Sequence, residues 1–401
     1  MATSIIISGK SLVEAARSMS HLLSLEGFVC VKADPAEKVI NMYGFVTRGG
    51  FFFERRTLKA EEGSIFDEDL DIVLDKGSAP YLQKLSSDDK MVSGTVSLSP
   101  GFLLISSVSK HQLDEVKEIV LNKTASLPIL SRAFKPEIES IQKRLEKFNT
   151  AIKFEANALT IKEAFAAGSS CAALLGAANQ ELNAVFVNID EKDKVVFAGT
   201  DGFRAAMYEA VLDGAREYAG KHTVGYGLAV MLGKYLNKKD KVLCAFVDKY
   251  LIMTIANETC SYTVGGSLLK YEHPKYEPYF NAFNSTTACT VNRALLLDLI
   301  SSVYSLTEDN SFRRGNLVIS KGILSVYNPL KPTDRSSGLP VASRVDRELS
   351  VNSGYISTLL KLFPNSEEIS FNFTDKNEGD PVVITSASEP HVRSFFVPLR
   401  K

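Results

Sequence analysis

The sequence has no excess of charge of either sign. Its 46 lysines and arginines are balanced by 47 aspartates and glutamates, which gives a formal net charge of −1 at pH 7. A chain with this balance lacks the diffuse positive charge of a histone-like nucleic-acid binder. Any contact with a polyanion must therefore be local.

Paired cysteines and long apolar runs are also missing. The cysteines are odd in number, and no two stand at C-x-x-C spacing, which favours free thiols in a reducing compartment over disulfides or a zinc site. They are Cys30, Cys171, Cys244, Cys260 and Cys289. The opening MATSIIISGK lacks the basic segment of a signal peptide. No run approaches the roughly 18 apolar residues of a membrane span. We expect a soluble cytoplasmic protein without metal or cofactor.

Motifs of catalysis are incomplete wherever they begin. Gly9–Ser11 resembles the end of a phosphate-binding loop, but Ser4 stands where that loop needs glycine. Gly225 and Gly227 start a G-x-G, but Val230 takes the place of the third glycine. No H-E-x-x-H or G-x-S-x-G string occurs. The sequence does not indicate an enzyme.

What the sequence does contain is a repeat of pattern. Three times a short alternating strand runs into an amphipathic helix, and a second helix begins about 65 residues after the first. The first helices are expected from Lys10, Thr160 and Asn292, and the second helices from Ser78, Tyr226 and Gly354. Strands such as MVSGTVSLS follow, with apolar residues at every second position. We expect an α+β fold of three repeated domains, each with two helices on antiparallel sheets, at 1–135, 150–283 and 285–401.

Two segments exceed this plan. Residues 136–149 are expected to form a helical linker, and helical spacing extends back to residue 113. The apolar residues that carry this spacing are Leu113, Val116, Val120, Ile138, Ile141, Leu145 and Phe148. Residues 329–347, rich in proline, serine and charge, are expected to form a long loop.

Three short stretches resemble one family. They are TDGFR at 200–204, HPKYEPYF at 273–280 and the ending SFFVPLRK at 394–401. Together with the three repeats they resemble the bacterial DNA sliding clamp, the beta subunit of DNA polymerase III. The resemblance implies a ring of two head-to-tail chains that encircles duplex DNA without sequence readout and tethers the polymerase, the clamp loader and other proteins.

The family binds its partners through short peptides in a hydrophobic cleft. Carried over by position, the cleft comprises Leu182, Thr200, Gly202, Arg204, Ala205, Pro274, Pro278, Tyr279, Phe395, Val397, Pro398, Leu399 and Arg400. Arg204 and Arg400 are expected to hold carbonyls or carboxylates of the partner. Ala205 stands where the family usually has leucine, so one wall is expected to be wider. The alternative is that Phe203, Phe395 and Phe396 only fill the core.

The tail and the basic residues complete the expectations. Because Pro398 cannot extend a sheet ladder, the residues from Val397 on are expected to leave the last strand and lie against the Thr200–Ala205 turn. The resemblance places basic residues of the helices toward DNA: Lys10, Arg17, Lys84, Lys162, Lys234, Lys238, Lys239, Arg293 and Lys361. Acidic residues lie among them, so an adaptor that keeps the cleft but does not encircle DNA is the alternative function.

Overall fold

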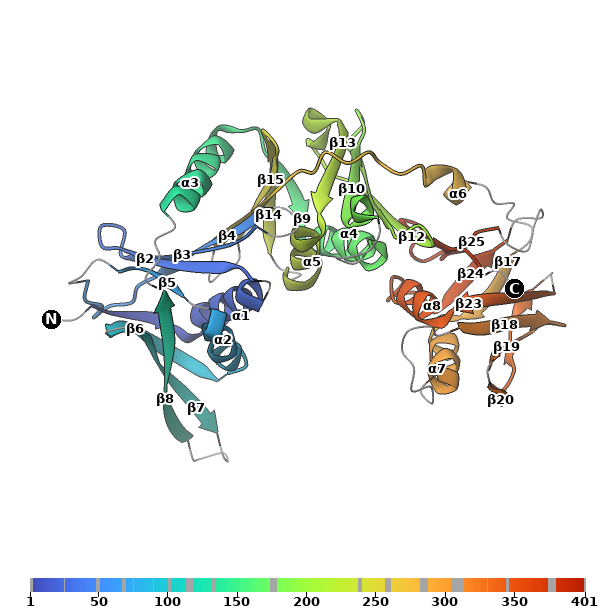
Figure 1. Ribbon diagram of the computed structural model, residues 1–401, viewed down its shortest axis with the longest axis horizontal. Helices are drawn as coiled ribbons and strands as arrows, with labels where there is room; N and C mark the ends of the chain where they lie inside the picture. The colour runs from blue at the N-terminus through green and yellow to red at the C-terminus, as the bar shows by residue number, and fades with distance from the viewer. Residues whose placement is uncertain are drawn as a thin grey trace. The chain divides into compact units, whose positions relative to one another are not determined.

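A computed structural model of the chain describes most of its residues. The described ranges are 3–24, 26–47, 51–66, 70–74, 76–88, 90–99, 102–112, 118–130, 135–173, 179–236, 240–256, 261–281, 288–304, 314–329, 331–343, 346–373 and 380–399. Contacts divide the chain into two compact units, Met1–Leu159 with Tyr235–Leu269, and Thr160–Lys234 with Lys270–Lys401. Each is described by itself below, and Figure 1 labels their elements.

The first repeat has eight strands and two α-helices. In chain order these are β1 Ser4–Ser8, α1 Gly9–Ser24, β2 Phe28–Asp34, β3 Val39–Val46, β4 Phe52–Lys59, β5 Asp71–Leu74, α2 Ala79–Ser86, β6 Met91–Ser99, β7 Phe102–Gln112 and β8 Glu118–Leu130. The buried residues Leu12, Met19 and Leu22 recur at helical spacing along α1, which packs on the sheet. The helix therefore forms because one of its faces is apolar and covered.

The second and third repeats have the same order of elements. The second comprises β9 Phe154–Asn157, α4 Ala158–Cys171, β10 Ala184–Ile189, β11 Lys194–Thr200, β12 Arg204–Val211, β13 Gly220–Gly225, α5 Tyr226–Tyr235, β14 Lys241–Val247, β15 Tyr250–Ala256 and β16 Ser261–Ser267. The third comprises β17 Ala288–Asn292, α7 Arg293–Tyr304, β18 Arg314–Ser320, β19 Ile323–Asn328, β20 Lys331–Arg335, β23 Arg347–Asn352, α8 Ser353–Leu360, β24 Glu368–Asn372, β25 Val382–Thr385 and β26 Val392–Phe396. The three predicted repeats are confirmed.

The repeats are joined by continuous antiparallel sheets. In the first unit, the fourth strand of repeat one (β4) pairs with the eighth strand of repeat two (β16), from Phe52 opposite Gly266 to Thr57 opposite Ser261. In the second unit, the fourth strand of repeat two (β12) pairs with the eighth strand of repeat three (β26). We call these pairings the first and second seams. Because the second repeat contributes strands to both units, the predicted domain boundaries stay predictions.

Glycine in the third strand of a repeat lets the first helix approach the sheet. A Cβ at Gly44 in β3 would lie 2.2 Å from Cδ1 of Leu22 in α1. A Cβ at Gly199 in β11 would lie 1.9 Å from the carbonyl oxygen of Gly168 in α4. A side chain at Gly199 would meet the backbone of the helix and push it outward, whereas one at Gly44 would displace the end of the Leu22 side chain.

Helix α3, Lys135–Thr150, connects the first two repeats along the chain. It lies over the segment predicted to be helical, and its apolar stripe, Ile138, Ile141, Leu145 and Phe148, is buried. Arg144 contacts two rings, with its guanidinium carbon 4.9 Å from the centre of Phe51 and 4.2 Å from that of Tyr250. Arg144 thus lies against Tyr250 in β15 and against Phe51, the residue before β4.

Two expectations about the extra segments are wrong. Val120 lies in strand β8 and not in a helix, because this stretch pairs residue by residue with β7; Leu113 and Val116 lie outside the described residues. The segment 329–347 contains β20 and two further short strands, β21 Leu339–Pro340 and β22 Ala342–Ser343. These complete the edges of β19 and β17, so the segment is not a plain loop.

Candidate functional site

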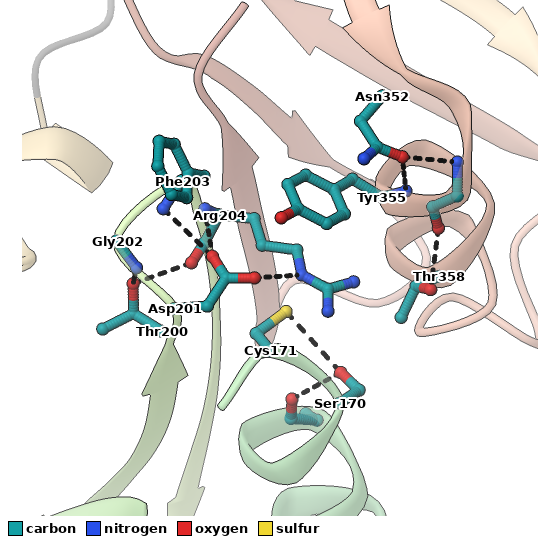
Figure 2. A network of polar contacts seen from close by, with 12 residues as sticks. Ser170, Cys171, Thr200, Asp201, Gly202, Phe203, Arg204, Asn352, Tyr355 and Thr358 are labelled. Carbon is teal, nitrogen blue, oxygen red and sulfur yellow. Dashed lines mark hydrogen bonds and ion pairs between the residues drawn. The ribbon is translucent and has the colours of Figure 1, made fainter. Parts of the chain in front are cut away.

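The turn between β11 and β12 is held by its own side chains. Asp201 accepts hydrogen bonds at Oδ1 from the backbone nitrogens of Phe203 and Arg204, each 3.0 Å away. The Thr200 hydroxyl accepts from the nitrogen of Gly202 at 3.0 Å and donates to the carbonyl of Arg204 at 2.7 Å. Gly202 has φ of 91°, which favours glycine. Figure 2 shows this network. The TDGFR sequence therefore specifies one rigid turn.

The side chain of Arg204 is already engaged within the chain. Its Nε lies 3.0 Å from Oδ2 of Asp201, and its guanidinium carbon lies 4.3 Å from the ring centre of Tyr355 (Figure 2). Both charged side chains are mostly buried. A guanidinium in this position is oriented by an ion pair and by a ring face at once. Asp201 thus occupies Nε of Arg204, and the expectation that Arg204 holds carbonyls or carboxylates of a partner stays a prediction for its other nitrogens.

Tyr355 is a site residue that the sequence did not reveal. It lies in the first turn of α8, which Asn352 caps by accepting hydrogen bonds from the nitrogens of Gly354 and Tyr355. Burial, and then the nearby Asp201 carboxylate, raise the pKa of the Tyr355 phenol. The hydroxyl therefore stays protonated at neutral pH. The sequence analysis expected a helix from Gly354, and nothing in that pattern indicates that Arg204 lies near Tyr355.

The apolar part of the site is filled by the chain's own aromatic rings. Ala205 lies opposite Phe395 across the second seam. The ring of Phe395 lies 5.6 Å from that of Tyr279 and 5.0 Å from that of Phe280. Ala205 is 0% exposed and Phe395 is also buried. Phe395 therefore belongs to the core, as the alternative held for this residue, and the wider wall at Ala205 stays a prediction.

Two aromatic side chains remain accessible at this surface. Phe203 is 60% exposed in the turn, and Tyr279 is 48% exposed in α6, Glu277–Asn281. Val397 and Leu182 are half-buried. Exposed aromatic side chains are unfavourable in water, and they are typical of surfaces that recognise a partner. We call Phe203, Tyr279, Val397 and Leu182 the aromatic surface.

The C-terminal residues follow the predicted path. Strand β26 ends at Phe396, and the nitrogen of Val397 donates to the carbonyl of Phe203 at 2.8 Å. The nitrogen of Leu399 then donates to the carbonyl of Ser350 in β23 at 2.7 Å. The tail thus leaves its strand and lies against the turn, as expected, and it also forms a hydrogen bond with β23, which was not expected. Arg400 lies outside the described residues.

The remaining predicted site residues differ in accessibility. Thr200 and Pro398 are buried, Pro274 is half-buried, and Gly202 and Pro278 are exposed. A Cβ at Gly202 would lie 3.9 Å from Cδ1 of Leu182, so these two residues are neighbours. The structure thus brings the turn, the tail and α6 onto β12 and β26.

The basic residues of the helices fall into two groups. Five are exposed, namely Lys10, Arg17, Lys84, Lys234 and Lys361, whereas Lys162 and Arg293 are half-buried. Arg293 donates from Nε to the carbonyl of Ser366 at 2.9 Å, so its charge supports the loop after α8. Lys238 and Lys239 lie outside the described residues.

Within the described part of the chain, no cluster of three metal-binding side chains occurs. Among the same residues, no helix is long and apolar enough to cross a membrane. Cys171, next to Arg204 in Figure 2, is buried, which raises the pKa of its thiol to about 11. A thiol with so high a pKa is a poor nucleophile at neutral pH.

No protein-family model and no curated protein matches the chain in sequence. Solved structures match it over its whole length. The DNA polymerase III beta subunit from Thermotoga maritima has a TM-score of 0.74 over 99% of each chain at 17% identity. The chain has the sliding-clamp fold.

Other clamps give the same result. The beta subunit from Borrelia burgdorferi, solved in complex with a natural product, has a TM-score of 0.71 over 99% of each chain at 14% identity. The sliding clamp from Bacillus subtilis has a TM-score of 0.70 over 100% of each chain at 14% identity. The predicted α+β clamp fold is confirmed, in a chain whose sequence has diverged far from these clamps.

Proposed function

We propose that this protein is a DNA polymerase processivity factor, a sliding clamp that encircles duplex DNA in the cytoplasm and catalyses no reaction. The observation that carries the proposal is the match to clamp structures along the full chain. The match includes all three repeats, so no part of the clamp architecture is missing. A protein that needed only the peptide surface could do without the first repeat.

The seams support a closed ring of two chains. Each seam joins the fourth strand of one repeat to the eighth strand of the next. Within the described residues this rule leaves two strands without a partner from another repeat, the fourth strand of repeat three (β20) and the eighth strand of repeat one (β8), which pairs with β7 and, at Ile129 and Leu130, with β5. A second chain placed head to tail supplies the missing partner for both, which removes the open edges.

The aromatic surface is proposed to bind short peptides of the polymerase, the clamp loader and other clamp-binding proteins. Phe203 and Tyr279 supply accessible apolar area, and the Arg204 and Tyr355 pair holds the turn that presents Phe203. Peptide recognition of this kind needs a rigid apolar platform with a few fixed polar groups. Arg400 is kept as the basic group of the tail in this proposal.

DNA is proposed to contact the helices through phosphate charges alone. The exposed lysines of the helices, one or more in each repeat, supply local positive charge on a nearly neutral chain. Such contacts carry no sequence information and weaken with salt. A ring on DNA needs little affinity, because topology retains it.

One experiment tests the ring directly. The protein is loaded onto nicked circular DNA with a clamp loader, and its retention is measured before and after a single cut linearises the circle. We expect retention on the circle at high salt and release after linearisation. Equal retention on both forms, or none on either, would contradict encirclement.

The second candidate function is an adaptor that keeps the aromatic surface without encircling DNA. Strand β20 favours it, because its pairing with β19 is interrupted by a bulge between Tyr327 and Asn328. The engagement of Arg293 with the carbonyl of Ser366 also favours it. A monomer that binds peptides but is not retained on circular DNA would identify this function.

A further inference from the structure

The two seams begin with the same hydrogen bond. In the first seam the nitrogen of Ser267 donates to the carbonyl of Phe51 at 2.8 Å, and in the second the nitrogen of Val397 donates to the carbonyl of Phe203 at 2.8 Å. Each bond extends the antiparallel ladder of its seam by one residue. Phe51 therefore takes at the first seam the place that Phe203 takes at the second.

These two equivalent phenylalanines differ in what lies over them. Phe203 is 60% exposed, whereas Phe51 is half-buried. The guanidinium carbon of Arg144 in α3 lies 4.9 Å from the ring centre of Phe51, and the Tyr250 ring meets the Phe51 ring edge-on at 6.4 Å. Arg144 also donates from Nη2 to the Tyr250 hydroxyl at 2.8 Å. We call Phe51 and Tyr250 the first-seam surface, which a helix of the same chain covers.

Helix α3 and helix α6 occupy the same place in the order of elements. Each lies between the eighth strand of one repeat and the first strand of the next. Helix α6 has 5 residues and places Tyr279 and Phe280 on Phe395. Helix α3 has 16 residues, packs on β14 and buries Ile141 completely. The connection at the first seam is thus a full amphipathic helix, which the second seam lacks.

The polar contacts of α3 hold it only weakly. Among the described residues, Nη1 of Arg144 is buried without a hydrogen-bond partner, which is unfavourable. Lys147 Nζ lies 2.8 Å from Oδ2 of Asp248, but the two side chains are 60% and 56% exposed. Exposed ion pairs of this kind add little stability. The attachment of α3 therefore depends on its apolar stripe and on the rings under Arg144, as that of a bound peptide would.

We propose that the first-seam surface is a second recognition surface and that α3 occupies it as an internal ligand. This inference rests on the proposed peptide-binding role of the aromatic surface and extends that role to the first seam. The chemistry of α3 defines the partner segment that fits in its place, an amphipathic helix with an apolar stripe and one arginine over the two rings. Exchange of α3 for such a segment lets one chain hold a second partner.

Calorimetry with α3 itself as the probe tests the exchange. In the full-length double variant Ile141→Glu with Arg144→Glu, the internal ligand loses its apolar and ring contacts, while Phe51 and Tyr250 are unchanged. A synthetic peptide of residues 135–150 should bind this variant once per chain, about tenfold or more tightly than it binds the wild type, whose surface is occupied.

Two controls fix the site of binding. Gln142→Glu with Lys143→Glu places the same two side chains on the exposed part of α3 and should behave as the wild type. Adding Phe51→Ala to the first double variant should weaken the peptide about tenfold or more. A folded double variant that does not bind the peptide, or binding that is unchanged by Phe51→Ala, would overturn the proposal.

Hydrogen exchange of the wild type gives a test that needs no variant. We expect the amides of α3 to exchange by local opening, about tenfold or more faster than those of β14 and β15. Equal protection of helix and strands would overturn the exchange of α3. Binding of the 135–150 peptide by the double variant, with no polymerase-derived peptide bound by the wild type, would confirm the first-seam surface and contradict the proposed role of the aromatic surface.

Discussion

Ala205 and Phe395 face each other across the second seam, the smallest apolar side chain opposite one of the largest. Directly opposed residues in an antiparallel pair share one space, so their volumes are coupled. Ala205 is completely buried, and Tyr279 and Phe280 cover the Phe395 ring. The identity of one residue of this pair thus fixes the size that the other can have.

Ala205→Leu is therefore expected to destabilise the protein by about 1–3 kcal/mol, because the added atoms have no free space. Phe395→Val is expected to cost about 2 kcal/mol or more, since it leaves a cavity. The double variant should recover most of the loss, because total volume is nearly kept. Urea unfolding of the three variants measures this coupling, and simple additivity of the two single losses would contradict it.

A second prediction separates the two roles of Asp201. Asp201→Asn keeps an oxygen for the nitrogens of Phe203 and Arg204 but removes the charge that faces Arg204. Asp201→Ala removes both. We expect Asp201→Ala to lower stability by about 2 kcal/mol and Asp201→Asn by clearly less. Calorimetric melting is the measurement, and equal losses in the two variants would show that the turn does not depend on the Oδ1 bonds.

A third prediction concerns the tail. Removing Val397–Lys401 should leave the strands intact, because β26 ends at Phe396. Binding of a polymerase-derived peptide should fall by about 2 kcal/mol or more, the usual loss when a buried anchor goes. Leu399→Ala is the milder control. Calorimetry with the truncated protein checks this, and full peptide affinity would refute the role of the tail.

The fourth prediction concerns acid. Burial acts to raise the pKa of Glu209, but Lys194 and Arg393 outweigh it and hold that pKa below the ordinary 4.5. Lys194 Nζ lies 2.9 Å from the carboxylate and Arg393 Nη2 lies 2.6 Å from it. A carboxylate with a lowered pKa stabilises the fold above pH 4.5, and this contribution is lost as the pH falls below that value.

The stability difference between wild type and Glu209→Gln should therefore be largest near neutral pH and shrink on acidification below pH 4.5. Urea midpoints of both proteins from pH 3 to 7 measure it. A difference that is independent of pH would mean that Glu209 contributes packing and not charge.

The fifth prediction tests the helices against DNA. Reversal of Lys84, Lys234 and Lys361 to glutamate changes one lysine at the end of the second helix in each repeat. Each lost phosphate contact should lower the salt slope of binding by about one. The matched control reverses Lys32, Lys192 and Lys275, which are exposed outside the helices. An equal effect of both triple variants would indicate net charge alone.

Local pattern was enough to predict the repeats. Each repeat alternates strands and helices, and the spacing of apolar residues differs between the two. Tyr226 begins α5 as predicted, and Lys10 lies one residue inside α1. The same reasoning failed at Val120, where helical spacing of apolar residues also fits a strand whose partner, β7, was not considered. Spacing describes one segment and cannot tell what pairs with it.

The site was predictable only where the resemblance supplied the positions. The turn, α6 and the tail do meet, but exposure and partners depend on contacts between residues far apart in sequence. Nothing near Arg204 indicates that Tyr355 lies over its guanidinium. Nor does Ala205 by itself show that Phe395 fills the space beside it. Such pairs can be predicted only when the register of the second seam is known. No short stretch of the sequence indicates that register.

The seams also determine the order in which the chain can finish folding on the ribosome. Phe52 pairs with Gly266, so β4 waits for a strand made roughly 200 residues later. At synthesis rates of about 5–20 residues per second, that delay is on the order of 10–40 s. During this time the first repeat presents an open edge strand to every other nascent chain nearby. Slow translation or crowding of polysomes should therefore harm the yield of this protein before any finished molecule is unstable.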